Sequence, residues 1–325
     1  MTQAPVRLLL SPTAASRLGV QITDTLGSMQ WIHVRPDDTH ADFDAAFVSR
    51  DVTGLSTKHD VKLATQAFYD ALLAAPSLRW VHVHSAGADR PVYVALHERG
   101  VLVTTSPGAN ASVVAHSALA GILALVRRLP LLIAAQREHR WTPLYAEGLP
   151  RDLDGQTAVV VGWGSIGQRI GTLLRAVGLR VAVARHSAEP AGPGITTVRY
   201  AQLHELLPDA DWLVLCCPLS DATRNLVDGA TLSRLPPTAH IVNVSRGDVV
   251  DEDALIAALA GGKLAGAYLD VFAYEPLVAE SPLWDFPNVI ITPHCAGLSD
   301  GNEARVAQRF LEKLGRWARA MTSCS

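Results

Sequence analysis

Three polar side chains each follow an apolar, strand-like segment in the second half of this sequence. Arg246 comes after HIVNVS, Glu275 after LDVFAY and His294 after VIITP. Ligands of open α/β sheets bind outside the carboxyl ends of the strands, so we expect these three side chains to converge. The alternative is that they are unrelated, with Arg246 and Glu275 as ordinary surface charges.

An arginine, a glutamate and a histidine together suit the reduction of a ketone. Hydride arriving at a carbonyl carbon leaves an alkoxide that needs a proton, and histidine side chains ionise close to neutral pH. A carboxylate partner would orient the imidazole and favour its charged form. A guanidinium would hold a substrate carboxylate and polarise the carbonyl. The sequence therefore predicts catalytic roles for Arg246, Glu275 and His294.

A glycine-rich turn, Gly162-x-Gly164-x-x-Gly167, lies between the apolar segment TAVVV and a helical pattern that begins at Ile166. In dinucleotide sites one such glycine permits the tight turn, one lets the backbone approach a pyrophosphate, and one lets the helix pack on the strand. The helix N-terminus then offers unpaired N–H groups to the phosphates. The alternative is a plain strand–helix turn, which the flanking strand and helix disfavour.

The residue that would read the ribose of a bound dinucleotide lies at the end of the next predicted strand, LRVAVA. It is Arg185, at 185 − 162 = 23 residues from Gly162. An acidic residue there would bind the ribose hydroxyls of NAD, whereas an arginine pairs with the 2′-phosphate of NADP. His186 and Ser187 add donors, so NADP(H) is favoured over NAD(H). The alternative is that Arg185 only covers the adenine of NAD.

Two series of apolar segments and helical patterns position these residues. In the first third, strands are predicted at 6–10, 31–34, 45–49, 78–84 and 101–105, and a helix at 60–75. Later strands are predicted at 157–161, 179–184, 212–217, 240–244, 264–271 and 288–292, with helices at 166–177, 251–261 and 302–320. Such alternation predicts parallel α/β sheets. Because the glycine turn follows a complete α/β series, we expect two domains, with the nucleotide domain inserted into the first.

Composition excludes several classes of protein. Of the 325 residues, 49% are hydrophobic and 18% are charged, which rules out a disordered chain. With 28 Lys and Arg against 31 Asp and Glu, the net charge of −3 argues against a nucleic-acid-binding surface. The four cysteines form no CxxC pair, and no spacing of histidines and cysteines indicates a metal site. A reduced, cytoplasmic protein without a bound metal is therefore predicted.

The longest apolar stretch runs from Val113 to Gln136, but charged residues and a proline interrupt it. It predicts a buried helix, 113–129 with Ser112 as its N-cap, rather than a membrane span. A helix that is apolar on all sides must be covered on all sides, and one domain face covers only part of it.

The segment 112–150 is therefore expected to join two copies of the chain in a dimer. Trp141 would be an apolar anchor at this interface, and a further hypothesis is that it reaches the substrate cleft of the neighbouring copy and limits substrate size. The alternative is a tryptophan packed within its own chain.

Four segments resemble the D-isomer-specific 2-hydroxyacid dehydrogenases. They are GWGSIG (162–167), NVSRGDVVDEDALIAAL (243–259), GAYLDVFAYEPL (266–277) and NVIITPHCAG (288–297). Segments before the glycine turn are also similar to the family, namely SAGAD (85–89), 103–130 and 151–162. The resemblance implies two doubly wound, parallel-sheet, Rossmann-like domains with the active site in the cleft between them. The substrate domain would comprise 1–110 plus 298–325, and the NAD(P) domain 111–297.

The resemblance also implies roles for single residues. Arg246 would orient the substrate, Glu275 would pair with the histidine, and His294 would donate the proton. Ala86 and Gly87 match the loop whose backbone N–H groups hold the substrate carboxylate. Cofactor contacts are expected at Gly162, Gly164, Ser165, Ile166, Gly167, Cys217, Pro218, Val244, Ser245 and Asp270. Asp270 matches the aspartate that contacts the nicotinamide carboxamide.

Two positions depart from the family's pattern. NAD-preferring members have an aspartate where this chain has Arg185, which agrees with the charge argument for NADP(H). Many members have a glutamate where this chain has His116, and we assign that histidine no catalytic role. His84 abuts the SAGAD segment and either lines the substrate pocket or is a satisfied polar group at the sheet face.

The sequence thus predicts an NAD(P)-dependent reductase of small 2-keto acids, with glyoxylate and hydroxypyruvate as first candidates. Two other functions stay open: a nucleotide-sensing protein that has the fold without turnover, and an oxidoreductase for another small anion such as formate or phosphite. The joint presence of Arg246, Glu275 and His294 argues against the sensor.

Overall fold

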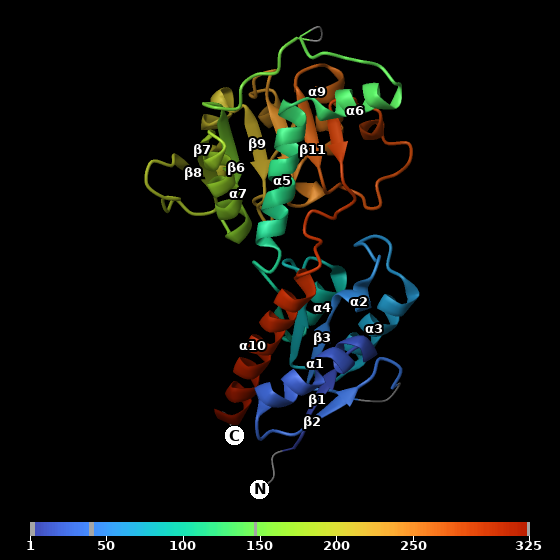
Figure 1. Cartoon of the computed structure of the whole chain (residues 1–325). Helices are drawn as coiled ribbons and strands as arrows, with labels where there is room; N and C mark the ends of the chain where they lie inside the picture. Colours follow the sequence, from blue (N-terminus) through green and yellow to red (C-terminus); the bar gives the residue numbers. More distant parts are fainter. Residues whose placement is uncertain (1–3, 39–41, 146–147, 324–325) are drawn as a thin grey trace. The chain divides into compact units, whose positions relative to one another are not determined.

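The chain leaves its first folded unit after residue 110 and returns to it at residue 299. The computed structural model describes residues 4–38, 42–145 and 148–323 (Figure 1). Unit 1 comprises Met1–Asn110 and Ser299–Ser325, and unit 2 comprises Ala111–Leu298. The second boundary lies one residue later than the sequence analysis has it. Unit 2 is thus an insertion in the chain of unit 1.

Unit 1 is built on a parallel sheet with the strand order β2-β1-β3-β4-β5. Its strands are β1 (Val6–Leu9), β2 (Trp31–Val34), β3 (Ala45–Val48), β4 (Trp80–Val83) and β5 (Leu102–Thr104). Its helices are α1 (Pro12–Leu26), α2 (Arg50–Thr53), α3 (Leu63–Ala74), α4 (Pro91–Glu98) and α10 (Asn302–Ser323). This is the flavodoxin-like order of a doubly wound sheet.

Helices cover both faces of this sheet. Ala45 and Phe47 of β3 belong to the core layer that contains α1 and α10, whereas Ala46 and Val48 belong to the layer that contains α3 and α4. Successive side chains of a strand point to opposite faces, so a strand buried on both faces is a continuous apolar run. The predicted strands of unit 1 are confirmed, with β3 and β4 buried along their whole length and the edge strands β2 and β5 partly exposed.

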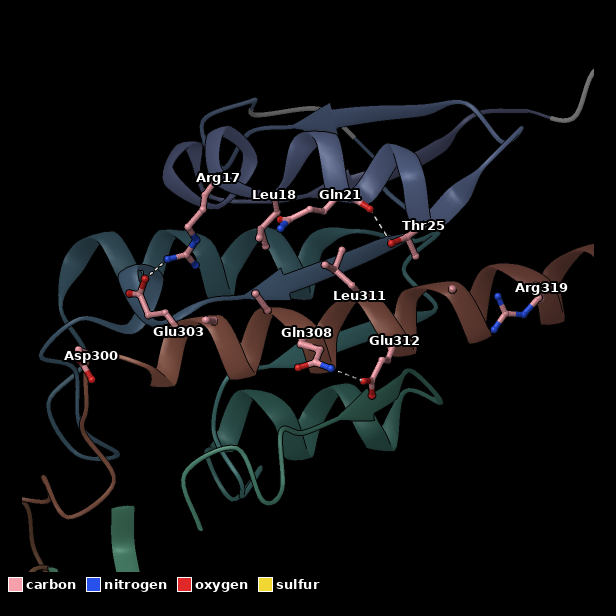
Figure 2. Close-up of a pocket in the computed structure, with 13 residues that line it drawn as sticks. Arg17, Leu18, Gln21, Thr25, Asp300, Glu303, Gln308, Leu311, Glu312 and Arg319 are labelled. Atoms are coloured by element: carbon pink, nitrogen blue, oxygen red, sulfur yellow. Dashed lines mark hydrogen bonds and ion pairs between the residues drawn. The ribbon is translucent and has the colours of Figure 1, made fainter. Parts of the chain in front are cut away.

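The returning helix α10 is part of the core of unit 1. Phe310 stacks on Phe47 with ring centroids 4.4 Å apart. On the outer side, α1 and α10 border a groove of about 860 Å³, across which Arg17 and Glu303 point toward each other and form an ion pair (Figure 2). Because exposed ion pairs contribute little, the buried ring stacking is what fixes α10 in place.

Unit 2 is built on a parallel sheet with the strand order β12-β11-β10-β9-β6-β7-β8. Its strands are β6 (Thr157–Val161), β7 (Arg180–Arg185), β8 (Thr197–Arg199), β9 (Trp212–Leu215), β10 (His240–Asn243), β11 (Gly266–Leu269) and β12 (Val289–Ile291). Its α-helices are α5 (Ala111–Val126), α6 (Leu129–Arg137), α7 (Ser165–Ala176), α8 (Gly229–Leu232) and α9 (Glu252–Ala260). The direction of strand addition reverses between β6 and β9, and ligands of such sheets bind at this switch point.

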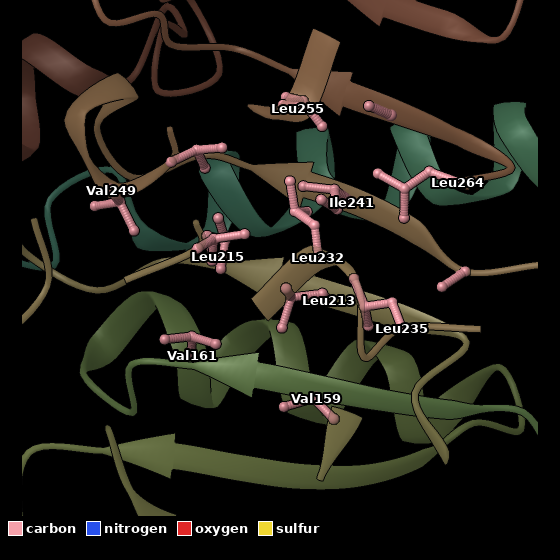
Figure 3. Packing of buried hydrophobic residues seen from close by; sticks show 14 of the residues in the cluster. Val159, Val161, Leu213, Leu215, Leu232, Leu235, Ile241, Val249, Leu255 and Leu264 are labelled. Atoms are coloured by element: carbon pink, nitrogen blue, oxygen red, sulfur yellow. The ribbon is translucent and has the colours of Figure 1, made fainter. Parts of the chain in front are cut away.

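Two apolar layers enclose the sheet of unit 2. Val159 and Val161 of β6 lie beside Leu213 and Leu215 of β9 in one layer (Figure 3). The alternate residues of the same strands pack in the other layer with α5 and α7. The doubly wound α/β fold predicted from the sequence is therefore confirmed.

The predicted helix 113–129 was wrong in its bounds. α5 begins at Ala111, so Ser112 lies in its first turn and does not cap it. After α5 ends, Arg128 adopts a φ of 53°, and α6 follows at an angle of 69° with Pro130 in its first turn. A left-handed residue and a proline both interrupt a helix, and this accounts for the break.

The backbone of α5 packs closely against the sheet of unit 2. An added Cβ at Gly121 would lie 2.4 Å from ring atoms of Tyr268 in β11, so only glycine fits there. The buried residues of α5 are Ala111, Val114, Ala115, Ala118, Gly121, Ile122 and Leu125. Within the described ranges no single helix has the length and apolar character to cross a membrane, and α5 and α6 reach them only together, as a bent pair.

The α-helices that the sequence analysis did not predict are α1, α2, α4, α6 and α8. Among these, α1 and α4 of unit 1 begin alike. Both have a proline in their first turn, Pro12 and Pro91. Ser11 caps α1, since its Oγ accepts a hydrogen bond of 3.0 Å from the N–H of Ala14. A Ser-Pro pair ahead of a periodic apolar segment is a helix-start signal that would have located α1.

Candidate active site

The three candidate catalytic side chains follow three neighbouring strands of unit 2. Arg246 follows β10, Glu275 follows β11 and His294 follows β12. Nδ1 of His294 lies 2.7 Å from Oε2 of Glu275. The positive charge of Arg246 acts on the Glu275 carboxylate, and its Nη1 donates to the carbonyl of Ser245 at 2.7 Å. The structure therefore brings the three residues to one edge of one sheet.

The Glu275 carboxylate is held in its charged form. Its side chain is 16% exposed, against 48% for His294. Burial alone would raise the pKa of Glu275. The hydrogen bond with His294, the hydrogen bond from the N–H of Phe272 at 3.2 Å and the charge of Arg246 outweigh burial, so the pKa of Glu275 lies below its ordinary value of 4.5. A charged carboxylate accepts Nδ1–H of the imidazole and orients the ring, which leaves Nε2 to exchange a proton with a ligand.

The backbone of His294 is strained. Its φ of 49° lies in the left-handed region that side chains other than glycine rarely adopt. Its N–H donates to the carbonyl oxygens of Asp270 at 2.8 Å and Thr292 at 3.0 Å, which hold it there. Such strain costs on the order of 1–3 kcal/mol and clusters at functional sites.

Asp270 ties the segment that carries His294 to the end of β11. The residue is buried, and Oδ1 accepts from Oγ1 of Thr292 at 2.6 Å and from the N–H of Cys295 at 2.9 Å. Both carboxylate oxygens also accept from the N–H of Ala296. Burial raises the pKa of Asp270 more than these hydrogen bonds lower it. In this structure, the aspartate that the resemblance assigned to the nicotinamide fixes the histidine segment.

Two residues that the sequence analysis did not single out fix the segment that carries Glu275. An added Cβ at Gly247 would lie 1.8 Å from the carbonyl carbon of Phe272, so the loops after β10 and β11 touch backbone to backbone. Oε2 of Glu252, at the start of α9, accepts from the N–H of Ala273 at 3.0 Å. The position of Gly247 directly after a candidate catalytic arginine was a signal that could have identified it. No local pattern in the sequence indicates the role of Glu252.

The three glycines of the turn after β6 meet three different demands. Gly162 has a φ of 100°, and its added Cβ would lie 2.7 Å from the backbone of Cys217. At Gly167 an added Cβ would lie 2.1 Å from the carbonyl oxygen of Gly162, so the helix packs directly on the turn. At Gly164 nothing lies within 4 Å of an added Cβ. Strain, helix packing and an open approach are the three features of a dinucleotide turn.

The N-terminus of α7 lies beside this open position. Gly164 is the N-cap residue and supplies no side-chain hydrogen bond to the first turn, which contains Ser165, Ile166 and Gly167. The first N–H groups of a helix have no partner within the helix, and they carry the positive end of its dipole. The residues present therefore fit the pyrophosphate of a dinucleotide.

Cys216 and Cys217 pack against the glycine turn at Gly162. The thiol of Cys216 donates to the carbonyl oxygen of Gly162 at 3.2 Å, and Cys217 is buried. Burial raises the pKa of Cys216 well above its ordinary value and that of Cys217 to about 12, so both stay protonated. They act as small packing residues.

The other expected cofactor residues follow β7 and β9, the two neighbours of β6, and β10, the strand next to β9. Arg185 ends β7 and is partly buried; Nη1 donates to the carbonyl oxygen of Glu189 at 3.3 Å, and Nη2 lies 3.5 Å from its carboxylate. His186 is exposed and Ser187 is partly buried. The remaining expected residues, Pro218, Val244 and Ser245, follow β9 and β10. These segments surround the switch point of the sheet.

Unit 1 contains the expected substrate loop. Ala86 is exposed after β4, and Oγ of Ser85 donates to the carbonyl oxygen of Gly87 at 2.6 Å. His82 is a satisfied polar group, since its ring nitrogens lie 2.9 Å from hydroxyls of Thr104 and Ser106. Across the described ranges, no three His, Cys, Asp or Glu side chains are grouped to hold a metal ion.

Comparison with protein families matches residues 119–296 to the D-isomer specific 2-hydroxyacid dehydrogenase, NAD binding domain. Over 234 residues the chain is 37% identical to D-3-phosphoglycerate dehydrogenase of Mycobacterium tuberculosis, covering 72% of this chain and 44% of that one. Over 249 residues it is 34% identical to a glyoxylate reductase of Korarchaeum cryptofilum, covering 74% and 73%. The chain thus spans less than half the length of the first of these relatives.

Among solved structures, the chain is similar to an NADPH-dependent glyoxylate/hydroxypyruvate reductase of Sinorhizobium meliloti in complex with NADP and malonate. The TM-score is 0.73 at 29% sequence identity, and the alignment covers 97% of this chain and 94% of that one. The likeness therefore extends over both units.

Gly247→Ala is expected to disrupt the contact between the loops after β10 and β11. A methyl group cannot fit 1.8 Å from a carbonyl carbon, and overpacking of this kind costs roughly 1–3 kcal/mol or more. Gly19→Ala, in the interior of α1 with nothing within 4 Å, is the control and should be neutral or stabilising. Denaturant unfolding measures both, and equal stability of the two variants would contradict the close contact.

Acidification is expected to remove the stabilisation that charged Glu275 provides. Because its folded pKa lies below 4.5, the contribution is fully present above that ordinary value and is lost as pH falls through the lower folded pKa. The free energies of unfolding of the parent and of Glu275→Gln should therefore differ most near neutral pH and converge in acid. A difference that is the same at about pH 7 and about pH 3 would show that charge is not its origin.

Proposed function

This chain belongs to the D-isomer-specific 2-hydroxyacid dehydrogenase family, and we propose that it interconverts a small 2-keto acid and the corresponding D-2-hydroxy acid with NAD(P)(H) as the redox partner. The observation that carries the proposal is the 2.7 Å contact between His294 and Glu275, at the same sheet edge as the glycine turn. A dinucleotide-binding protein that only senses its ligand has no need of a histidine held in a strained backbone conformation.

In the proposed reaction, the glycine turn and the N-terminus of α7 would hold the dinucleotide, whose nicotinamide would supply a hydride to the keto carbon of the substrate. Nε2 of His294 gives a proton to the oxygen that becomes the hydroxyl, and Glu275 stabilises the imidazolium before transfer. Arg246 holds the carboxylate of the substrate and polarises its carbonyl. In the reverse direction His294 accepts the proton as a general base.

The carboxylate of the substrate also needs donors, and the backbone N–H groups of Ala86 and Gly87 are proposed to supply them. Glyoxylate and hydroxypyruvate are the first candidate substrates. The support is that the relatives from Korarchaeum cryptofilum and Sinorhizobium meliloti carry these activities in their names.

NADP(H) is the proposed cofactor in preference to NAD(H). Arg185 ends the strand next to the glycine turn, and its contact with the exposed Glu189 is loose enough for a 2′-phosphate to replace. His186 and Ser187 follow directly and add donors. The similar reductase of Sinorhizobium meliloti was solved with NADP.

A homodimer is proposed to form through the segment 112–150. After α5, large apolar side chains stay exposed in the described part of this segment, and Trp141 is 94% exposed. The others are Leu129, Ile133, Tyr145 and Leu149. Exposed apolar side chains along one segment support an interface there, and a two-fold dimer is the commonest symmetric assembly.

His294→Gln is expected to lower kcat/KM for 2-keto acids by about 10²–10⁴-fold, because the general acid is lost, with the Kd of the cofactor little changed. Oxidation of NADPH and NADH against glyoxylate, hydroxypyruvate and pyruvate measures the activity. His204→Gln, an exposed histidine of unit 2, is the control and should keep it. No turnover of any 2-keto acid by the parent enzyme would overturn the proposed function.

Arg185→Asp is expected to raise the Kd of NADPH roughly 10- to 100-fold while sparing NADH, because a charge-assisted pair becomes a repulsion. Arg180→Asp changes the exposed first residue of the same strand, at the opposite edge of the sheet, and should leave both constants unchanged. Fluorescence titration with each nucleotide measures them. Equal weakening of NADH and NADPH would refute the NADP(H) preference.

Trp141→Glu is expected to weaken the dimer by placing a charge in its apolar interface. Sedimentation velocity at micromolar concentration should show a dimer for the parent and a shift toward monomer for the variant. Val20→Glu, which changes an exposed apolar residue of α1 in unit 1, serves as the matched control. A parent chain that sediments as a monomer would contradict the proposed assembly.

A further inference from the structure

One carboxylate of α9 binds outside its own helix, to the loop that carries Glu275. Glu252 is the first residue of α9, and its Oε2 accepts from the backbone N–H of Ala273 at 3.0 Å. The helix does not need this carboxylate as a cap, because Asp251 is the N-cap residue and its Oδ1 accepts from the N–H of Ala254 at 3.0 Å. The contact of Glu252 therefore holds the loop after β11 and not the start of the helix.

The segment from which Glu252 projects is fixed to the core of unit 2. Val249 and Leu255, which lie on either side of it in the chain, are buried in the same apolar layer (Figure 3). The N–H of Asp251 donates to the carbonyl oxygen of Val227 at 3.0 Å, and the N–H of Val227 donates to the carbonyl oxygen of Val249 at 3.1 Å. Because its backbone is held on both sides, the carboxylate of Glu252 starts from a rigid base.

Glu252 fixes the peptide group between Phe272 and Ala273. Phe272 is buried, and its carbonyl group lies so close to Gly247 that no Cβ fits between them. The N–H of Ala273, at the other end of the same peptide group, is bound by Glu252. A peptide group is planar, so a hydrogen bond to its N–H also fixes the direction of its C=O. The contact therefore opposes rotation of this peptide group away from Gly247.

The conformation of this turn decides where the Glu275 carboxylate points. Its Oε1 accepts from the N–H of Phe272 at 3.2 Å, in the peptide group directly before the one that Glu252 holds. Its Oε2 lies 2.7 Å from Nδ1 of His294. The Glu275 carboxylate thus binds its own turn with one oxygen and the histidine with the other. A rotation of the turn would change both contacts together.

The surroundings of Glu252 favour its use as a hydrogen-bond acceptor over its use as a charge. Burial raises the pKa of Glu252, the hydrogen bond from Ala273 lowers it, the charge of Asp253 raises it, and the net pKa lies above 4.5. Burial disfavours the charged form because water is lost, and the N–H of Ala273 replaces part of that hydration. A neutral acceptor oxygen in the same place should therefore hold the loop as well.

We propose that Glu252 is a positioning residue for the proton donor: by binding the N–H of Ala273 it keeps the Glu275 carboxylate on Nδ1 of His294. This inference rests on the proposed function, in which Glu275 stabilises the imidazolium of His294 before proton transfer. Glu252 acts through the turn alone, so its replacement slows proton transfer and leaves the binding of the cofactor unchanged.

The test separates the reach of the side chain from its charge. Glu252→Gln keeps an acceptor oxygen at the same distance from the backbone without the charge. Glu252→Asp keeps the charge on a side chain that is shorter by a methylene group and does not reach Ala273. Glu252→Ala removes both reach and charge. Asp253→Ala, which removes the exposed acid next to Glu252 in the first turn of α9, is the matched control.

The measurement is the single-turnover rate of NAD(P)H oxidation with whichever 2-keto acid the parent enzyme reduces best. The rate should fall about 10- to 100-fold in Glu252→Ala and in Glu252→Asp, because a small displacement of a catalytic group has an effect of this size. Glu252→Gln and Asp253→Ala should stay within about threefold of the parent. An unchanged Kd of the cofactor shows that each variant is folded, and if Glu252→Ala does not fold, the comparison of Glu252→Gln with Glu252→Asp carries the test.

Two further readouts distinguish positioning from a loss of stability. A displaced Glu275 carboxylate favours the imidazolium less, so in Glu252→Ala the rate of reduction should begin to fall at a lower pH than in the parent, and Asp253→Ala should keep the parent profile. In the Glu275→Gln background, Glu252→Ala should have almost no additional effect, because the residue that it positions is already neutral.

Effects of Glu252→Ala and Glu275→Gln that multiply in the double variant, or equal rates in Glu252→Gln and Glu252→Ala, would overturn the inference while leaving the proposed function intact. If the parent reduces no 2-keto acid, the proposed function fails, and the NMR resonance of Nδ1–H of His294, assigned by its absence from His294→Gln, still tests the contact. A resonance that persists in the parent and in Glu252→Gln but is lost to exchange with water in Glu252→Ala supports the positioning role. An equal resonance in all three refutes it.

Discussion

The candidate site of unit 2 depends on one constraint, the parallel pairing of five successive strands of its sheet: β6, β9, β10, β11 and β12. The ladder continues beyond the ends of the strands, because the N–H of Val244 donates to Leu215, that of Asp270 to Asn243, and that of Thr292 to Leu269. Each segment that carries a polar side chain therefore leaves the sheet in register with its neighbour. The contact between His294 and Glu275 follows from this registration and needs no long loop to find it.

Close backbone approach then sets the shape of the site. Gly162, Gly167 and Gly247 each stand where a Cβ would overlap another backbone, so the turn and the two loops form nearly without side chains between them. Buried polar groups complete the frame: Oδ1 of Asn243 accepts the N–H of Ser245 at 3.0 Å, and the carboxylate of Asp270 holds the segment after β12. Because a buried polar group without a partner is costly, these bonds make the native arrangement specific.

Charged side chains near the carboxyl ends of the strands have different partners in the two units. In unit 2 the carboxylate of Glu275 is matched by His294 and by the charge of Arg246. In unit 1 the guanidinium of Arg90 has neutral partners, the carbonyl oxygen of Ser56 at 2.6 Å and the hydroxyl of Tyr69 at 3.1 Å. A carboxylate that is paired with a histidine orients the imidazole for proton exchange.

The sequence by itself determined every strand except the short edge strand β8, and it determined the glycine turn. Short apolar runs located β2 at 31–34, a partly exposed edge strand, and β6 at 157–161, a buried strand, to the residue. The identity of Arg246, Glu275 and His294 as strand-end residues was visible for the same reason, and the motif segments led to the family that the comparisons show.

Only the tertiary structure decided what those residues touch. The sequence analysis expected one helix over 113–129, but the left-handed conformation of Arg128 and the bend after α5 depend on packing against the rest of unit 2. The bonds from Asp270 to Ala296, and from Glu252 to Ala273, join residues more than twenty positions apart, which no local pattern encodes. Local periodicity fixes the elements, whereas satisfaction of buried polar groups is a property of the assembled fold.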